Sequence, residues 1–96
     1  MRIARVVGSA VSTIKVDALR GTKLLVVQSA SVRDELEGDP FVAVDVIGAG
    51  EGELVLISEG SAGRHTDQTT DAPVDAVILA ILDSLEVGGE STFRKS

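Results

Sequence analysis

Short runs of β-branched and aliphatic residues, set apart by glycines, are the feature that most limits how this chain can fold. The runs are Ile3–Val7, Val11–Ile14, Lys23–Val27, Phe41–Ile47 and Leu54–Ile57. In the run that begins at Phe41, valines alternate with other residues, which is the period of a strand buried on one face. Gly8 interrupts the first apolar stretch and predicts a bend or bulge inside a long strand. The pattern predicts a mainly β fold, a small closed or partly open Greek-key or OB-like β-barrel with few exposed edges.

One segment nearer the C-terminal end has a different pattern. Pro73 can open a helix at its first position, and Asp75 would then lie in the first turn, where a carboxylate is favourable. Residues Ala76–Leu82 are apolar on every face, so periodicity does not separate a buried helix from a buried strand. We expect one short helix from Pro73 to about Ala80, followed by a strand through Leu85.

Self-association is the simplest source of extra burial for a chain this short. With 96 residues and no long linker, we expect a single domain over residues 1–96, with 88–96 as a C-terminal tail. Such a chain buries only about 60–65% of its unfolded surface. It has no cysteine and one histidine, which excludes disulfides and thiolate sites, and we expect no metal or cofactor. Its 44% hydrophobic residues leave apolar area for a partner to cover.

Composition also argues against nucleic acid and membrane as partners. Aromatic residues are 2% of the chain, so few side chains are available to stack on nucleic-acid bases. The net charge of −6 repels phosphate. The longest apolar run, Ala76–Leu82, is too short to span a bilayer, and no apolar signal segment follows Met1–Arg5. We therefore expect a protein of the cytoplasm.

A glycine-rich stretch in the middle of the chain could be mistaken for a dinucleotide-binding loop. It consists of Gly48, Ala49, Gly50, Glu51 and Gly52. The spacing differs from G-x-G-x-x-G, and a strand-like run follows instead of a helix. A tight turn between two strands is the simpler interpretation, with glycine supplying positive φ. On this ground, Gly50→Val should cost stability or assembly.

No constellation of catalytic side chains stands out, and the chain is not expected to be an enzyme. Carboxylates are plentiful, but nothing in their spacing selects an acid/base pair in two different environments. We expect them to be solvated or ion-paired, with Asp45 bound to a lysine or a backbone amide. His65 is alone in a polar loop, and Ser61 lacks the preceding glycine that a nucleophile elbow requires.

Three segments carry a resemblance to a known family. They are MRIARVVGSAVSTIKVDALRGTKLLVVQ at the start, GAGEGELVLISEGSAGR in the middle and PVDAVILAILD near the end. Together they resemble the CcmL/EutN-type vertex proteins of bacterial microcompartments, small pentamers that close the corners of carboxysome and metabolosome shells. The resemblance extends from Met1 to about Val87 and is interrupted at Ser31–Asp39 and His65–Ala72.

This resemblance implies a structural shell protein that assembles with itself as a homopentamer, or alternatively a hexamer. Its partners would be hexameric shell proteins, in a shell within the bacterial cytoplasm. In such vertex proteins the loop that matches Gly48–Gly52 lies toward the five-fold axis around a narrow pore, with Glu51 at its variable place. The residues expected at the subunit interface are Glu53, Ser61, Arg64 and Phe93.

Two of these interface expectations have a physical reason of their own. Arg64 can form a bidentate pair with a carboxylate of a neighbour. Phe93 is the one large apolar group of a polar tail, and burying it on a neighbour would contribute about 1.5–3 kcal/mol. The alternative for this segment is a frayed terminus.

A rival function is an OB-like module that binds a small anionic or nucleotide ligand in its loops. The negative net charge and the scarcity of aromatic residues argue against an oligonucleotide as the ligand, but not against a small metabolite. The mass of the oligomer separates the two hypotheses, because a ligand-binding barrel has no reason to form a closed ring.

Overall fold

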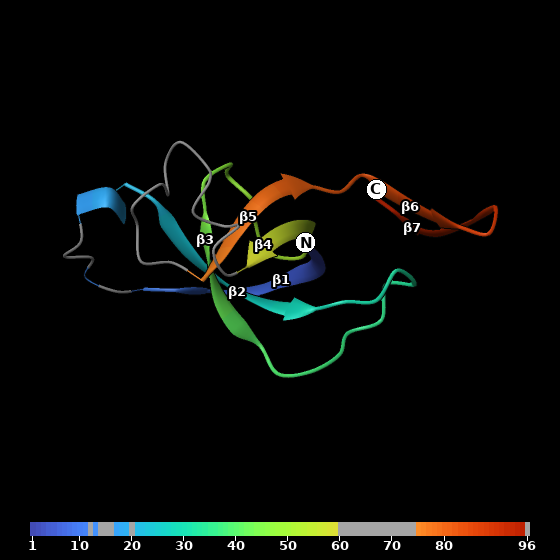
Figure 1. The fold of residues 1–96 in the computed structure, drawn as a ribbon, viewed down its shortest axis with the longest axis horizontal. Helices are drawn as coiled ribbons and strands as arrows, with labels where there is room; N and C mark the ends of the chain where they lie inside the picture. The colour runs from blue at the N-terminus through green and yellow to red at the C-terminus, as the bar shows by residue number, and fades with distance from the viewer. Residues whose placement is uncertain (12, 14–16, 20, 60–74, 96) are drawn as a thin grey trace.

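Seven strands and one short 3-10 helix make up the part of the chain that the structure, a computed structural model, describes: residues 1–11, 13, 17–19, 21–59 and 75–95 (Figure 1). In chain order these elements are β1 (Arg2–Ala10), η1 (Asp17–Leu19), β2 (Lys23–Ser29), β3 (Phe41–Asp45), β4 (Leu54–Glu59), β5 (Ala76–Ile81), β6 (Ser84–Val87) and β7 (Glu90–Arg94).

Five of these strands close into a barrel in the order β1-β2-β3-β5-β4. The β4–β1 pair completes the circle, and β3–β5 is the one parallel pair within it. This arrangement confirms the Greek-key, OB-like barrel predicted from the sequence. Closure pairs both sides of each barrel strand, so the barrel itself offers no free edge for aggregation.

The barrel interior is filled by small and medium aliphatic side chains from alternate positions of the strands. Phe41 and Ile81 pack at its margins. The buried cluster comprises Ala4, Val6, Leu25, Val27, Ala43, Ala49, Val55, Ile57, Ala76 and Ile78. Because β-branched residues favour extended backbone and pack well on a pleated surface, the same residues supply both the strand preference and the core.

The first strand contains the irregularity predicted at Gly8. The β1–β2 register shifts between Val6 and Gly8, so that Val6 lies opposite Val27 and Gly8 lies opposite Val26. A bulge of this kind increases the local twist, which helps a long strand to bend around a small barrel.

The prediction of a helix from Pro73 to about Ala80 is wrong for the residues of this segment that the structure describes. Ala76–Ile81 is β5, which lies between β3 and β4 (Figure 1). Ile78 points into the barrel and Val77 into a small cluster outside it, and both are completely buried. A strand that is buried on both faces is apolar at every position, so its sequence lacks the alternation that identifies a half-buried strand. Pro73 lies outside the described residues.

Two other boundaries differ from the expectation. The run at Phe41 ends as a strand at Asp45 and not at Ile47. Val11 and Thr13 are not in a strand, and the rest of that predicted run lies outside the described residues.

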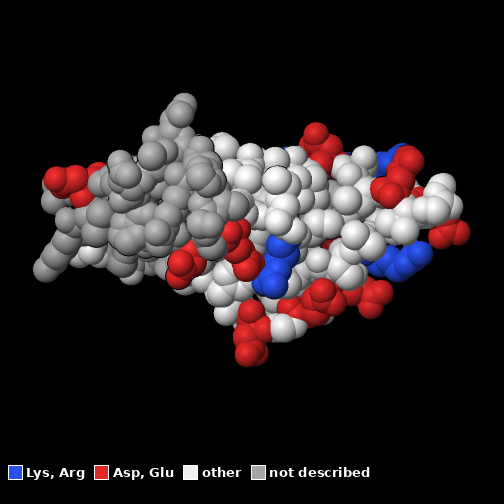
Figure 2. All heavy atoms as spheres, in the orientation of Figure 1, with Lys and Arg blue, Asp and Glu red and all other residues white. Residues whose placement is uncertain are grey.

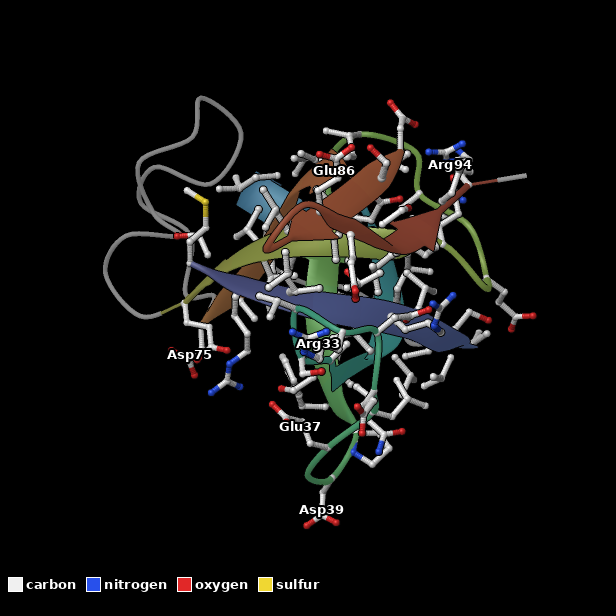
Figure 3. The ribbon with its side chains drawn as sticks, turned by 90° about the vertical axis from the view of Figure 1, so that its right-hand side faces the viewer. Arg33, Glu37, Asp39, Asp75, Glu86 and Arg94 are labelled. Atoms are coloured by element: carbon white, nitrogen blue, oxygen red, sulfur yellow. The ribbon has the colours of Figure 1, made fainter. Side chains whose placement is uncertain are left out.

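The C-terminal segment forms a hairpin that was not foreseen from the sequence. β6 and β7 are antiparallel, and Gly88 and Gly89, with φ of 61° and 84°, make the turn. The hairpin extends away from the barrel at one end of the longest axis of the molecule, and η1 lies at the other end (Figure 1). The molecule measures 44 Å along this axis and 24 and 23 Å along the other two. Figure 3 shows Glu86 and Arg94 on this hairpin, with Asp39 at the tip of a separate loop.

Candidate assembly site at the glycine loop

The glycine loop joins β3 to β4 and is anchored at both ends. Gly48 and Gly52 have φ of 86° and 85°, a conformation that favours glycine, so the expected positive φ is confirmed at these two positions. It is wrong for Gly50, whose φ lies outside that region and whose added Cβ would meet Glu53 Oε1 at an ordinary 3.6 Å. Ala49 is 1% exposed, and its side chain packs in the barrel core and so anchors the loop there.

Asp45 fixes the first half of the loop. Its Oδ1 accepts hydrogen bonds from the backbone amides of Ile47 and Gly48, both at 3.1 Å. The expectation that a backbone amide binds this carboxylate is confirmed. Because these bonds begin at the last residue of β3, they end the strand and start the turn.

Strand β1 holds the second half of the loop. The Gly52 amide donates to the Val6 carbonyl at 2.8 Å, and the Val6 amide donates to the Glu53 carbonyl at 2.9 Å. Arg5 Nη1 donates to the Gly52 carbonyl at 2.6 Å, while its Nη2 forms an ion pair with Asp34. The loop is therefore tied to the barrel by backbone and side-chain bonds together.

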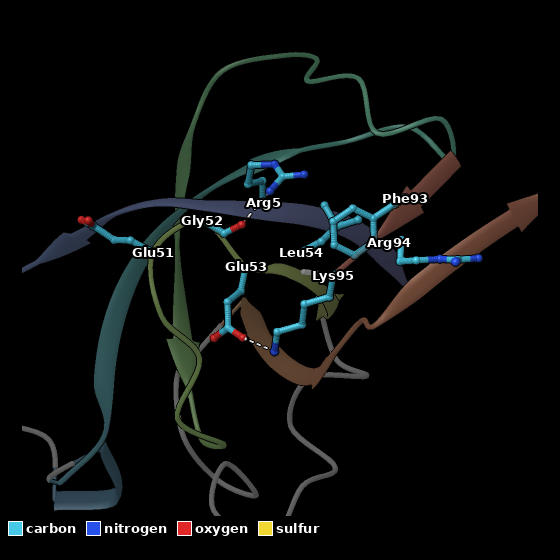
Figure 4. A pocket seen from close by; sticks show the side chains of 8 residues that line it. All are labelled: Arg5, Glu51, Gly52, Glu53, Leu54, Phe93, Arg94 and Lys95. Atoms are coloured by element: carbon cyan, nitrogen blue, oxygen red, sulfur yellow. Dashed lines mark hydrogen bonds and ion pairs between the residues drawn. The ribbon is translucent and has the colours of Figure 1, made fainter. Parts of the chain in front are cut away.

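Lys95, which directly follows β7, contacts the same loop through Glu53. Glu53 Oε1 accepts the Gly50 amide at 2.7 Å, and Oε2 pairs with Lys95 Nζ at 2.8 Å (Figure 4). The Arg5 guanidinium lies 5.7 Å from the centre of the Phe93 ring. Around these contacts is an open hollow of about 330 Å³, lined by Arg5, Glu51, Gly52, Glu53, Leu54, Phe93, Arg94 and Lys95.

The family model described as ethanolamine utilisation protein EutN/carboxysome matches residues 1–83. The chain belongs to this family. It is 48% identical over 85 residues to the carboxysome shell vertex protein CcmL of Thermosynechococcus vestitus, covering 88% of this chain and 86% of the relative. It is 45% identical over 89 residues to the bacterial microcompartment shell vertex protein PduN of Salmonella typhimurium, covering 88% and 98%.

Solved structures give the same assignment. CcmL of Gloeobacter violaceus superposes with a TM-score of 0.90 at 37% identity, covering 99% of this chain and 98% of that one. The GrpN pentameric microcompartment shell protein from Rhodospirillum rubrum superposes with a TM-score of 0.79 at 40% identity, covering 91% and 99%. The resemblance found in the sequence is thus confirmed in both sequence and fold.

The residues expected at the subunit interface of this EutN/CcmL chain are distributed as follows. Glu53 and Phe93 both line the hollow beside the glycine loop, where Glu53 binds Lys95 and Phe93 lies near Arg5 of the same chain. Glu51 is exposed at the turn. Ser61 and Arg64 lie outside the described residues. Interface roles for all of these stay predictions.

Arg5 and Lys95 are members of the site that were not singled out from the sequence. Arg5 could have been noticed, because it stands between two inward-facing residues of a strand and must point outward. Lys95 gave no local signal, since its partner Glu53 is 42 residues away.

The contacts around the hollow are hydrogen bonds and ion pairs within one chain, and they hold the glycine loop against the end of β7. Among the described residues, no group of three or more His, Cys, Asp or Glu side chains is placed to hold a metal ion. Within the same residues, no helix has the length and apolar character needed to cross a bilayer.

The ion pair between Glu53 and Lys95 should give stability a defined pH dependence. The hydrogen bond from Lys95, followed by that from the Gly50 amide, lowers the pKa of Glu53 below its ordinary 4.5. The hydrogen bond to Glu53 raises the pKa of Lys95 above its ordinary 10.5. Glu53 thus contributes stability above pH 4.5 that is lost as pH falls through its lowered pKa. Lys95 contributes stability below pH 10.5 that is lost as pH rises through its raised pKa.

Lys95→Met should therefore destabilise the protein between about pH 5 and 10, and the difference from the parent should shrink outside that window. Urea unfolding across the pH range measures it. Lys23→Met removes an exposed charge elsewhere on the barrel and serves as the control for net charge. A difference that is the same at every pH would show that the pair does not act in this way.

Proposed function

We infer that this chain is a structural shell protein of a bacterial microcompartment that forms cyclic pentamers capping the vertices of the polyhedral shell. The observation that carries this inference is the match to shell vertex proteins in sequence and fold over nearly the whole chain, with a pentameric shell protein among the structural neighbours. The protein then works in the bacterial cytoplasm, within the shell.

A ring of five copies follows the rules of cyclic assembly. Each interface joins two different surfaces, because contacts between identical patches stop at a dimer. Five copies at −6 each carry a formal charge of −30, so apolar contacts must overcome repulsion that salt screens beyond about 8–10 Å. Figure 2 shows carboxylates, with Lys and Arg side chains among them, along the margins of one face, beside an area without charged side chains.

The glycine loop is the part of each subunit that we place toward the five-fold axis. Its tight turn, with Ala49 buried and Gly50 bearing no side chain, lets five copies approach closely around a narrow pore. Glu51 is exposed and free to vary. Glu53, Ser61, Arg64 and Phe93 contribute to the contacts between neighbouring subunits. The Glu53–Lys95 pair supports this role by holding the loop and the hairpin in one arrangement.

The partners of the ring are hexameric shell proteins, whose flat lattice needs five-fold units to close. The protein is not an enzyme and acts through its shape. A small-molecule module is the weaker candidate, because Glu53 and Lys95 in the hollow already bind each other.

Co-expression with hexameric shell proteins tests this function. Electron microscopy should show closed particles when this chain is present, and open or elongated assemblies with unsealed corners when it is omitted. Equally closed particles without it would contradict the proposal.

A further inference from the structure

The outer side of strands β1, β2 and β3 carries an apolar surface. Val26 alternates with the buried Leu25 and Val27 and therefore faces outward. Its register partners are Gly8 on β1 and Val42 on β3. Val7 and Val42 are 42% and 50% exposed. We call the surface formed by Val7, Gly8, Val26 and Val42 the outer apolar face.

Part of the neighbouring surface is already covered by the chain itself. Val44 and Val77 face outward from β3 and β5 and are 4% and 0% exposed, because Leu19 of η1 and other aliphatic side chains pack on them. Leu24, opposite Val44, joins this cluster. The outer apolar face extends this covered cluster along β2 and β3, but it is itself open to solvent. A closed barrel needs apolar residues only inside, so an aliphatic row outside calls for a partner.

Gly8 adds an observation that points to close contact with another backbone. Its φ lies outside the left-handed region, and an added Cβ would meet only the Val26 Cβ, at an ordinary 3.7 Å. The fold of this chain therefore does not require glycine here. Glycine weakens a strand interior and is found at bulges or where a ligand or a second backbone must approach closely. The bulge at this position does not put Gly8 at positive φ, so close approach is the reason left for a glycine.

We propose that the outer apolar face is a docking surface for a second copy of this chain, whose backbone lies against Gly8. The proposal rests on the proposed function, because a ring of identical chains supplies the second copy. Charge also favours this occupant. Each copy carries −6, so two copies approach with least repulsion where charged side chains are absent, and interface centres are depleted of charge. In a ring, this face meets a different surface of the neighbour.

A single introduced thiol tests this surface, because the chain has no cysteine of its own. In the assembled protein, the thiol of Val42→Cys should react with a maleimide several-fold more slowly than in subunits dissociated by dilution. Leu36→Cys is the matched control, since Leu36 is 48% exposed but lies on the loop between β2 and β3. Its thiol should react equally fast in both states. Equal rates for Val42→Cys in the two states, or equal protection of both thiols, would overturn the proposal.

Substitutions give a second readout. Gly8→Leu and Val42→Asp should shift native mass spectra from the ring to monomers with unchanged far-UV circular dichroism, while Leu36→Asp should stay assembled. If either variant loses its fold, the thiol rates alone decide. A parent protein that is itself monomeric would contradict the proposed function. An assembled parent whose variants assemble equally well would contradict only the docking surface.

Discussion

Replacing Ile57 with alanine should lower the free energy of unfolding by about 2–5 kcal/mol, the largest effect that we expect from one substitution. Ile57 is completely buried in the centre of β4, opposite Ile78, and its truncation leaves a cavity that a barrel of closed strands cannot collapse to fill. At about 4–8 °C per kcal/mol for a domain of this size, the melting temperature should fall by at least about 8 °C.

Leu36→Ala is the control for this prediction. Leu36 is 48% exposed on a loop, so its truncation should change the free energy by no more than about 0.5 kcal/mol. Both variants must be melted at the parent's protein concentration, since assembly makes the melting temperature depend on it. If the Ile57→Ala protein had the same melting temperature as the parent, Ile57 would not lie in the barrel core.

Gly52→Val should be the next most damaging change, costing about 1–2 kcal/mol or more. The φ of Gly52 is 85°, where a residue with a Cβ is strained and a β-branched one more so. Its amide and carbonyl also bind Val6 and Arg5, so a shift of the backbone would break two contacts of the loop. Denaturant unfolding at fixed protein concentration measures the cost.

Gly50→Ala separates backbone strain from crowding at the ring axis. Gly50 is not in the left-handed region and has room for a Cβ, so the unfolding free energy should change by less than about 0.5 kcal/mol. A Gly50→Ala protein that unfolds with the free energy of the parent but no longer assembles would support the close approach of five loops. If Gly52→Val were as stable as Gly50→Ala, the strain argument would fail.

The barrel could be predicted because its strands carry their preference locally. The β-branched runs beginning at Ile3, Lys23 and Leu54 became β1, β2 and β4, and the glycine inside the first run became its bulge. The strand β5 could not be identified in the same way. Its burial on both faces arises from neighbours that are distant in sequence, and an apolar segment without alternation fits a helix equally well.

The site was predictable in outline but not in its contacts. A glycine turn was expected at residues 48–52, yet which glycine takes positive φ depends on the hydrogen bonds of Asp45 and Gly52. Arg5 reaches the Gly52 carbonyl over 47 residues and Lys95 reaches Glu53 over 42. Such pairs are created by barrel closure and by the hairpin, and no local pattern indicates them.

The most direct measurement of the central claim is the mass of the native assembly. Each chain has a mass of 9.9 kDa, so a closed ring of five weighs five times that, or 49.5 kDa. Native mass spectrometry at micromolar concentration should show this species as the dominant one. A spectrum with only monomers and dimers, or a dominant ring of six, would contradict a protein that closes five-fold vertices.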